Sequence, residues 1–124
     1  MQIAYIDDAG DVQTVVAPNA DVPPVLVFGG VAVRSDLLPQ LTRDFLALKR
    51  RWFGGRMKSP HLLDDVLVEI KGAELRTMVR QSHRQRRRAI QFLDGLLTLL
   101  EANDARIIGR AWIKAIGVPL QGDR

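Results

Sequence analysis

The chain contains no cysteine among its 124 residues, and this absence excludes several kinds of site. Disulfide bonds, thiolate zinc sites and cysteine nucleophiles all require that residue. No apolar run approaches the roughly 18 residues that a membrane-spanning helix needs. The N-terminus also lacks the basic and apolar regions of a secretory signal. We therefore expect a soluble cytoplasmic protein with no membrane partner.

Histidine is also scarce, since His61 and His83 are the only two. His61 has no partner at metal-ligand spacing, and His83 lies among arginines, which disfavours a cation site. We therefore interpret both as ordinary surface residues. The remaining composition, 47% hydrophobic and 26% charged, is typical of an ordinary globular protein. We predict a single domain over residues 1–124.

Acidic residues are nearly absent between Lys71 and Arg88, where seven basic residues accompany Glu74 as the single acid. This segment is more basic than the whole chain, whose net charge is +4. Such a segment favours a polyanionic partner such as nucleic acid, although a solvated helix face would have the same composition. The candidate nucleic-acid-binding residues are Arg76, Arg80, Arg84 and Arg87.

Hydrophobic patterns predict an α/β fold with the element order β-β-β-α-β-α-β. The predicted helices begin at Ser35 or Asp36 and at about Gln81, and end before Gly54 and near Ala102. Short turns between the opening strands favour antiparallel pairing, whereas the later strand-helix-strand section favours parallel pairing. We therefore expect a mixed β-sheet flanked by helices. The predicted strands cover residues 2–7, 12–16, 25–33, 66–72 and 105–116.

Glycines mark two special places in these strands. Gly10, in the acidic stretch 7–11, predicts a turn with positive φ. The Gly29-Gly30 pair inside an apolar strand indicates a bulge or a close approach of two backbones.

Carboxylates end two of the predicted strands, because Asp7 closes the first and Glu69 lies late in the fourth. If these strands are neighbours, the two side chains converge at one sheet edge and suit Mg²⁺ or Mn²⁺. Lys71 would then neutralise the charge on the phosphate that is cleaved in a nucleic-acid substrate. Asp8 is a further candidate ligand of the metal. In the alternative interpretation, Asp8 and Asp11 form a turn, and Glu69 and Lys71 form a surface ion pair worth at most ~1 kcal/mol.

Three motifs give the chain a resemblance to a known family. They are YIDDAGD at residues 5–11, LVFGGVAV at 26–33 and EIKG at 69–72. Together, in this order, they resemble the bacterial and phage family catalogued as domain of unknown function 3800. The first motif departs from the family pattern, since Asp8 replaces a glutamate and Ala9 a serine.

The resemblance implies a ribonuclease H-like fold, with Asp7 and Glu69 as ligands of the catalytic metal. It also implies a further acidic residue in a later helical section, for which this sequence offers only Asp123. We therefore expect a domain that is incomplete at its C-terminal end.

Two functions follow from these expectations. The first is a metal-dependent nuclease, or an inactive remnant of one, in which Asp7, Glu69 and Lys71 act on nucleic-acid phosphodiesters with Mg²⁺ or Mn²⁺. The second is a non-catalytic module that binds nucleic acid through its arginines and lacks a complete metal site. In a third interpretation, a homodimer covers apolar surface that a missing element leaves exposed.

Overall fold

The computed structural model describes residues 1–119, which form two compact units. The sheet unit contains Met1–Ala32 and the described residues from Arg106 onward, and the helical unit contains Val33–Ala105. No helix within residues 1–119 combines the length and apolar character that crossing a membrane requires. The prediction of one incomplete domain is not tested by this division.

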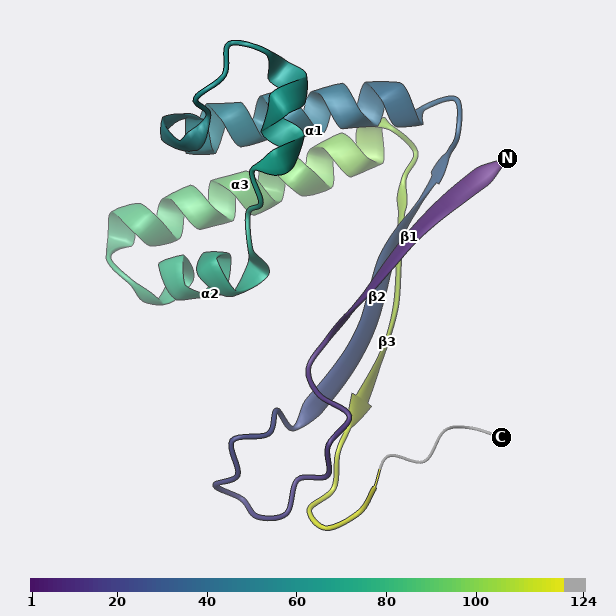
Figure 1. Cartoon of the computed structure of the whole chain (residues 1–124), viewed down its shortest axis with the longest axis vertical. Coiled ribbons are helices and arrows are strands. Elements are labelled where there is room, and N and C mark those ends of the chain that lie inside the picture. Colours follow the sequence, from purple (N-terminus) through teal and green to yellow (C-terminus); the bar gives the residue numbers. More distant parts are fainter. Residues whose placement is uncertain (120–124) are drawn as a thin grey trace. The chain divides into compact units, whose positions relative to one another are not determined.

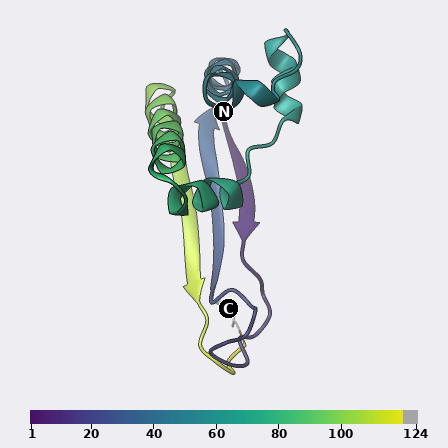
Figure 2. The ribbon, with the colours of Figure 1, turned by 90° about the vertical axis from the view of Figure 1, so that its left-hand side faces the viewer.

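The sheet unit is built on three strands: β1 (Gln2–Ala9), β2 (Val25–Arg34) and β3 (Arg106–Ile113). Their order is β1-β2-β3, and both neighbouring pairs run antiparallel (Figure 2). The β2–β3 register runs from Val25 opposite Ile113 to Ala32 opposite Arg106. The α/β class is thus confirmed, whereas the predicted parallel pairing is wrong for the described residues. The ribonuclease H-like strand order is not confirmed.

Two glycines allow close backbone contacts inside this sheet. A Cβ atom on Gly30 would overlap the carbonyl oxygen of Tyr5 on β1, whereas one on Gly29 would meet nothing nearer than 4.0 Å. Gly10 follows the end of β1 with a φ of 112°, and a Cβ there would overlap the carbonyl oxygen of Val25. The predicted close approach and the predicted positive φ are therefore both confirmed.

Residues 12–16 form no strand, contrary to prediction, because their backbone is bonded to residues after β3. The Lys114 ammonium donates to the carbonyl oxygens of Asp11 and Gln13, at 2.7 and 3.0 Å. The Gly117 amide donates to the carbonyl of Val15, which is buried. These bonds use acceptors that a β-ladder would otherwise use.

The helical unit contains α1 (Leu38–Phe53), α2 (Gly72–Arg80) and α3 (His83–Ala102), with short 3₁₀ helices η1 (Gly54–Arg56) and η2 (Leu62–Leu67) (Figure 1). The two predicted helices are confirmed within a few residues at each end. The predicted strand over 66–72 is wrong, because η2, a short extended link and the start of α2 occupy that segment.

The core of the helical unit lies where α1, α2 and α3 meet. Phe53 of α1 packs edge-to-face on Phe92 of α3, with 5.1 Å between ring centroids. Leu75 and Met78 of α2 pack against the same cluster, so α2 is held to the longer helices by apolar contact. This packing fixes the C-terminal end of α1 beside the N-terminal half of α3.

Candidate anion-binding site

The two predicted metal ligands belong to different units. Asp7 is exposed on β1 of the sheet unit, and its Oδ1 accepts a hydrogen bond of 2.9 Å from the Asp8 amide. Glu69 lies in the helical unit, on the link between η2 and α2, rather than at a strand end. The sheet-edge geometry that motivated the pair is therefore absent. Metal binding by Asp7, Glu69 or Asp8 stays a prediction.

Lys71 lies near Glu69 on the surface. Its Nζ is 4.0 Å from Oε2 of Glu69, and the two side chains are 69% and 74% exposed. An ion pair this long and this exposed contributes at most ~1 kcal/mol. Within residues 1–119, no three His, Asp or Glu side chains are grouped closely enough to hold a metal. Asp123 lies outside the described residues.

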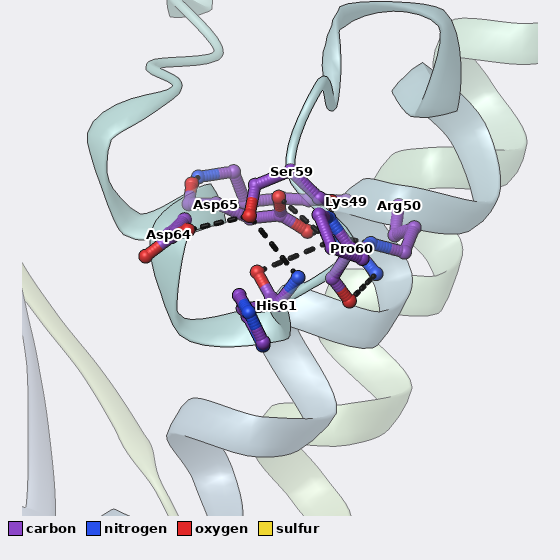
Figure 3. Close-up of polar contacts among 7 residues, drawn as sticks. All are labelled: Lys49, Arg50, Ser59, Pro60, His61, Asp64 and Asp65. Carbon is purple, nitrogen blue, oxygen red and sulfur yellow. Dashed lines mark hydrogen bonds and ion pairs between the residues drawn. The ribbon is translucent and has the colours of Figure 1, made fainter.

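A buried charged cluster joins α1 to η2, as Figure 3 shows. Asp65 is 1% exposed, and the Arg50 guanidinium donates to both of its carboxylate oxygens, at 2.8 and 3.0 Å. Lys49, 4% exposed, donates from Nζ to the Asp65 carbonyl oxygen at 2.6 Å. Burial lowers the pKa of Lys49, and the nearby Asp65 partly offsets this shift.

Arg50 also holds the loop that precedes η2, at residues 59–61. Arg50 also donates to the carbonyl oxygens of Ser59, Pro60 and His61 (Figure 3). The Ser59 hydroxyl in turn donates to Asp64 at 2.5 Å. Since these groups satisfy one another, we interpret the cluster as a structural clamp that holds the loop and η2 on α1. The sequence offered no signal for it beyond the adjacent charges.

A basic hollow of about 720 Å³ lies between the end of α1 and the first turns of α3. Four arginines line it: Arg51 from α1, and Arg84, Arg87 and Arg88 from α3. None of the residues lining this hollow is acidic. The remaining lining residues are Trp52, His83, Gln85 and Gln91.

Two of these arginines are oriented by aromatic neighbours. The Arg88 guanidinium donates to the backbone carbonyl of Trp52 and lies 4.9 Å from the centroid of the Phe53 ring. The Arg51 guanidinium lies 5.5 Å from the centroid of the Trp52 ring. Cation–π contacts and hydrogen bonds of this kind restrict the guanidinium orientations. The hollow is therefore partly preorganised for an anion.

The one acid of the basic segment is already paired. Arg56 of η1 donates two hydrogen bonds to the carboxylate of Glu74 on α2. The hydrogen bond from Arg56 holds the pKa of Glu74 below its ordinary value. A neighbouring hollow of about 280 Å³ contains this pair, so it suits an anion less well than the basic hollow does.

The predicted nucleic-acid-binding arginines divide between two places. Arg84 and Arg87 line the basic hollow, whereas Arg76 and Arg80 are exposed on α2 outside it. None of these four side chains makes a hydrogen bond or ion pair with another residue in the described part of the chain. The helical spacing of apolar residues predicts Trp52 as a packing residue of the first helix, and it does pack partly buried against the core while also lining the hollow. Arg51 was missed, because it lies far from the basic segment in the sequence.

Comparisons with protein-family models, curated proteins and solved structures find no match to this chain. The resemblance to the domain of unknown function 3800 family therefore stays an expectation from three short motifs.

Proposed function

We propose that this protein binds nucleic acid through the arginines of α2 and α3. The observation that carries the proposal is the set of four exposed arginines, Arg76, Arg80, Arg84 and Arg87, which have no partner within residues 1–119. Glu74, the acid nearest in sequence to Arg76 and Arg80, is already neutralised by Arg56. Free guanidinium groups on rigid helices suit phosphate oxygens, which they bind through charge-assisted and bidentate hydrogen bonds.

The proposal is tested by measuring how a labelled oligonucleotide binds as the salt concentration is raised. Since each phosphate contact on a single strand contributes about −0.7 to the slope of log K against log salt, the affinity should fall steeply. The double variant Arg84→Ala/Arg87→Ala should bind roughly tenfold more weakly at low salt, with a slope smaller by about 1 to 1.5. Fluorescence anisotropy measures both quantities.

Arg43→Ala is the matched control for this experiment. Arg43 is an exposed arginine of α1 that does not line the basic hollow and that donates to Gln40. Arg43→Ala removes one positive charge, as each single variant at Arg84 or Arg87 does. Its affinity for the oligonucleotide should stay within about twofold of that of the parent protein. Equal losses in the control and in single variants at Arg84 or Arg87 would indicate a general charge effect. Absence of binding at low salt would rule the proposal out.

Metal-dependent hydrolysis of the bound strand is a second candidate function. It is favoured by one observation: Asp7 and Asp8 are both exposed and form no ion pair within residues 1–119. Carboxylates in this condition are available to a hard cation such as Mg²⁺ or Mn²⁺. Their role is separable from arginine-mediated binding by the substitutions described in the Discussion.

A further inference from the structure

We infer that the basic hollow binds one nucleotide of a single strand, with its phosphate on the arginines and its base against Trp52. This inference rests on the proposed nucleic-acid binding and adds the kind of strand and the place where it is held. It starts from the chemistry of the lining residues, which combine guanidinium groups, an indole and two side-chain amides without any carboxylate.

The charge in the hollow suits a phosphate. Arg84 and Arg87 reach it from α3 and have no partner among the described residues, so their donors are available to a ligand. Arg88 is positioned by the Trp52 carbonyl and the Phe53 ring, and therefore loses little further freedom on binding. Arginines from two helices converge here, since Arg51 enters from α1. A phosphate in the hollow would thus meet donors from more than one side.

The size and the remaining groups of the hollow favour more than a phosphate. Its volume of about 720 Å³ lies within the range of about 300–1,000 Å³ typical of small-molecule sites, so a lone phosphate would leave most of it unfilled. Trp52 packs partly buried against the helical core, and the Arg51 guanidinium lies over its ring at the wall of the hollow, so a base can stack on this pair. Gln85 and Gln91 offer donors and acceptors for the edge of the base.

These features select a single strand over a duplex. In a duplex the bases are stacked on one another and only their edges are accessible, so the indole could not reach a base face. A single strand can place an unstacked base against an aromatic ring while its backbone follows the arginines. A duplex would keep only the phosphate contacts and should bind more weakly at the same salt concentration.

Fluorescence of Trp52 provides a direct test in the full-length protein. The chain has two tryptophans, and Trp112→Phe leaves Trp52 as the single tryptophan, whose emission is separated from that of Tyr5 by exciting the indole selectively. An oligothymidylate strand should quench this emission on binding, and it should bind at least tenfold more tightly than a duplex of equal length. Inorganic phosphate alone should compete weakly and should leave most of the emission unchanged.

Substitutions distinguish stacking from a structural role of Trp52. Trp52→Phe should keep most of the affinity, whereas Trp52→Ala should lower single-strand affinity about tenfold and leave duplex affinity nearly unchanged. Arg51→Ala should weaken single-strand binding, with Arg43→Ala as the matched control. Circular dichroism of each variant verifies that the helices are intact.

The possible outcomes separate the two proposals. If anisotropy shows binding but the duplex binds as tightly as the single strand and Trp52 emission does not change, the inference is wrong and nucleic-acid binding stands. If neither the single strand nor the duplex binds at low salt, the proposed function fails and this inference fails with it. Tighter single-strand binding with quenched emission supports both.

Discussion

At the scale of single residues, Asp65 is the buried acid on which the clamp between α1 and η2 depends. Its carboxylate is buried and is held by two hydrogen bonds from Arg50, while its backbone carbonyl accepts from Lys49. Removing one partner of a buried pair leaves the other charge uncompensated, which costs more than the pair contributes as a whole. The clamp is therefore sensitive to the loss of a single charge.

We predict that Asp65→Asn lowers the free energy of unfolding by about 2 kcal/mol, because the buried Asp65 would no longer neutralise Arg50, whose partial exposure to solvent weakens the pair. Urea unfolding followed by circular dichroism measures the change. Asp64→Asn is the control, since Asp64 is exposed and bonds only the nearby Ser59 hydroxyl, so its effect should stay below about 1 kcal/mol. Equal effects of both substitutions would contradict the clamp.

The glycine pair of β2 allows a second prediction at this scale. Gly30→Ala should destabilise the protein by about 1–3 kcal/mol, because the new methyl group would force β1 and β2 apart at the Tyr5 carbonyl. Gly29→Ala should be tolerated, since its Cβ would have no neighbour closer than 4.0 Å. Thermal unfolding of the two variants measures both effects. A larger loss of stability in Gly29→Ala than in Gly30→Ala would refute this prediction.

At the scale of elements, the helical unit is joined by ionic links as well as by its core. The pair between Arg56 and Glu74 connects η1 to α2. Both groups are partly exposed, so solvent weakens the link without removing it. Its contribution depends on the carboxylate being ionised.

We therefore predict a specific pH dependence for this link. The pKa of Glu74 is lowered in the fold, chiefly by the hydrogen bond from Arg56. Its stabilising contribution is thus complete above the ordinary pKa of a glutamate and is lost as the pH falls through the lower pKa in the fold. In urea unfolding, the free energy of unfolding of the parent should fall as the pH is lowered from the ordinary glutamate pKa through the lower pKa in the fold. In the Glu74→Gln variant this fall should be smaller. The control, Glu101→Gln, removes an exposed carboxylate that forms no ion pair within residues 1–119 and should leave the profile unchanged.

Elements with a strong and long pattern could be predicted from the sequence. Helical spacing of apolar residues predicted α1 and α3, and continuous or alternating apolar runs predicted β2 and β3. The run at residues 66–72 was misread because a short apolar segment suits a strand or a helix equally well. The run overlaps η2, whose Asp65 is held by Arg50 some 15 residues earlier. Local patterns carry no information on such a contact.

The candidate site was predictable only in part for a similar reason. The density of arginines between Lys71 and Arg88 indicated an anion partner. The hollow also needs Arg51 and Trp52, which reach it because the core packs α1 against α3. The proposed pair of Asp7 and Glu69 depended on a fourth strand that does not form.

At the scale of the whole molecule, the aspartates at or just after the end of the opening strand belong to a different unit from the basic segment. Asp7, Asp8 and Asp11 belong to the sheet unit, and the basic segment belongs to the helical unit. The exposed apolar side chains of the sheet include Tyr5, Ile6, Phe28 and Ile107. A homodimer that covers them stays a prediction, and light scattering that gives a monomer mass at micromolar concentration would dismiss it.

We predict that the double variant Asp7→Asn/Glu69→Gln binds a labelled oligonucleotide within about twofold of the parent, because the arginines are unchanged. The same protein, incubated with RNA or DNA and Mn²⁺ or Mg²⁺, tests the second candidate function on denaturing gels. Cleavage by the parent that disappears in the double variant would favour the nuclease. Cleavage that persists would remove Asp7 and Glu69 as its metal ligands.

The pairing of β2 with β3 has a consequence for how the chain folds. Ala32 and Arg106 are partners in the ladder although the whole helical unit lies between them in sequence. Closing so long a loop from an unfolded chain is slow, because its entropy must be lost before the ladder forms. The helical unit has its own core and can form first, which shortens the loop that remains to be closed. We therefore expect the sheet to form after the helical unit. Removal of β3 should disrupt the sheet and leave the helices of the helical unit intact.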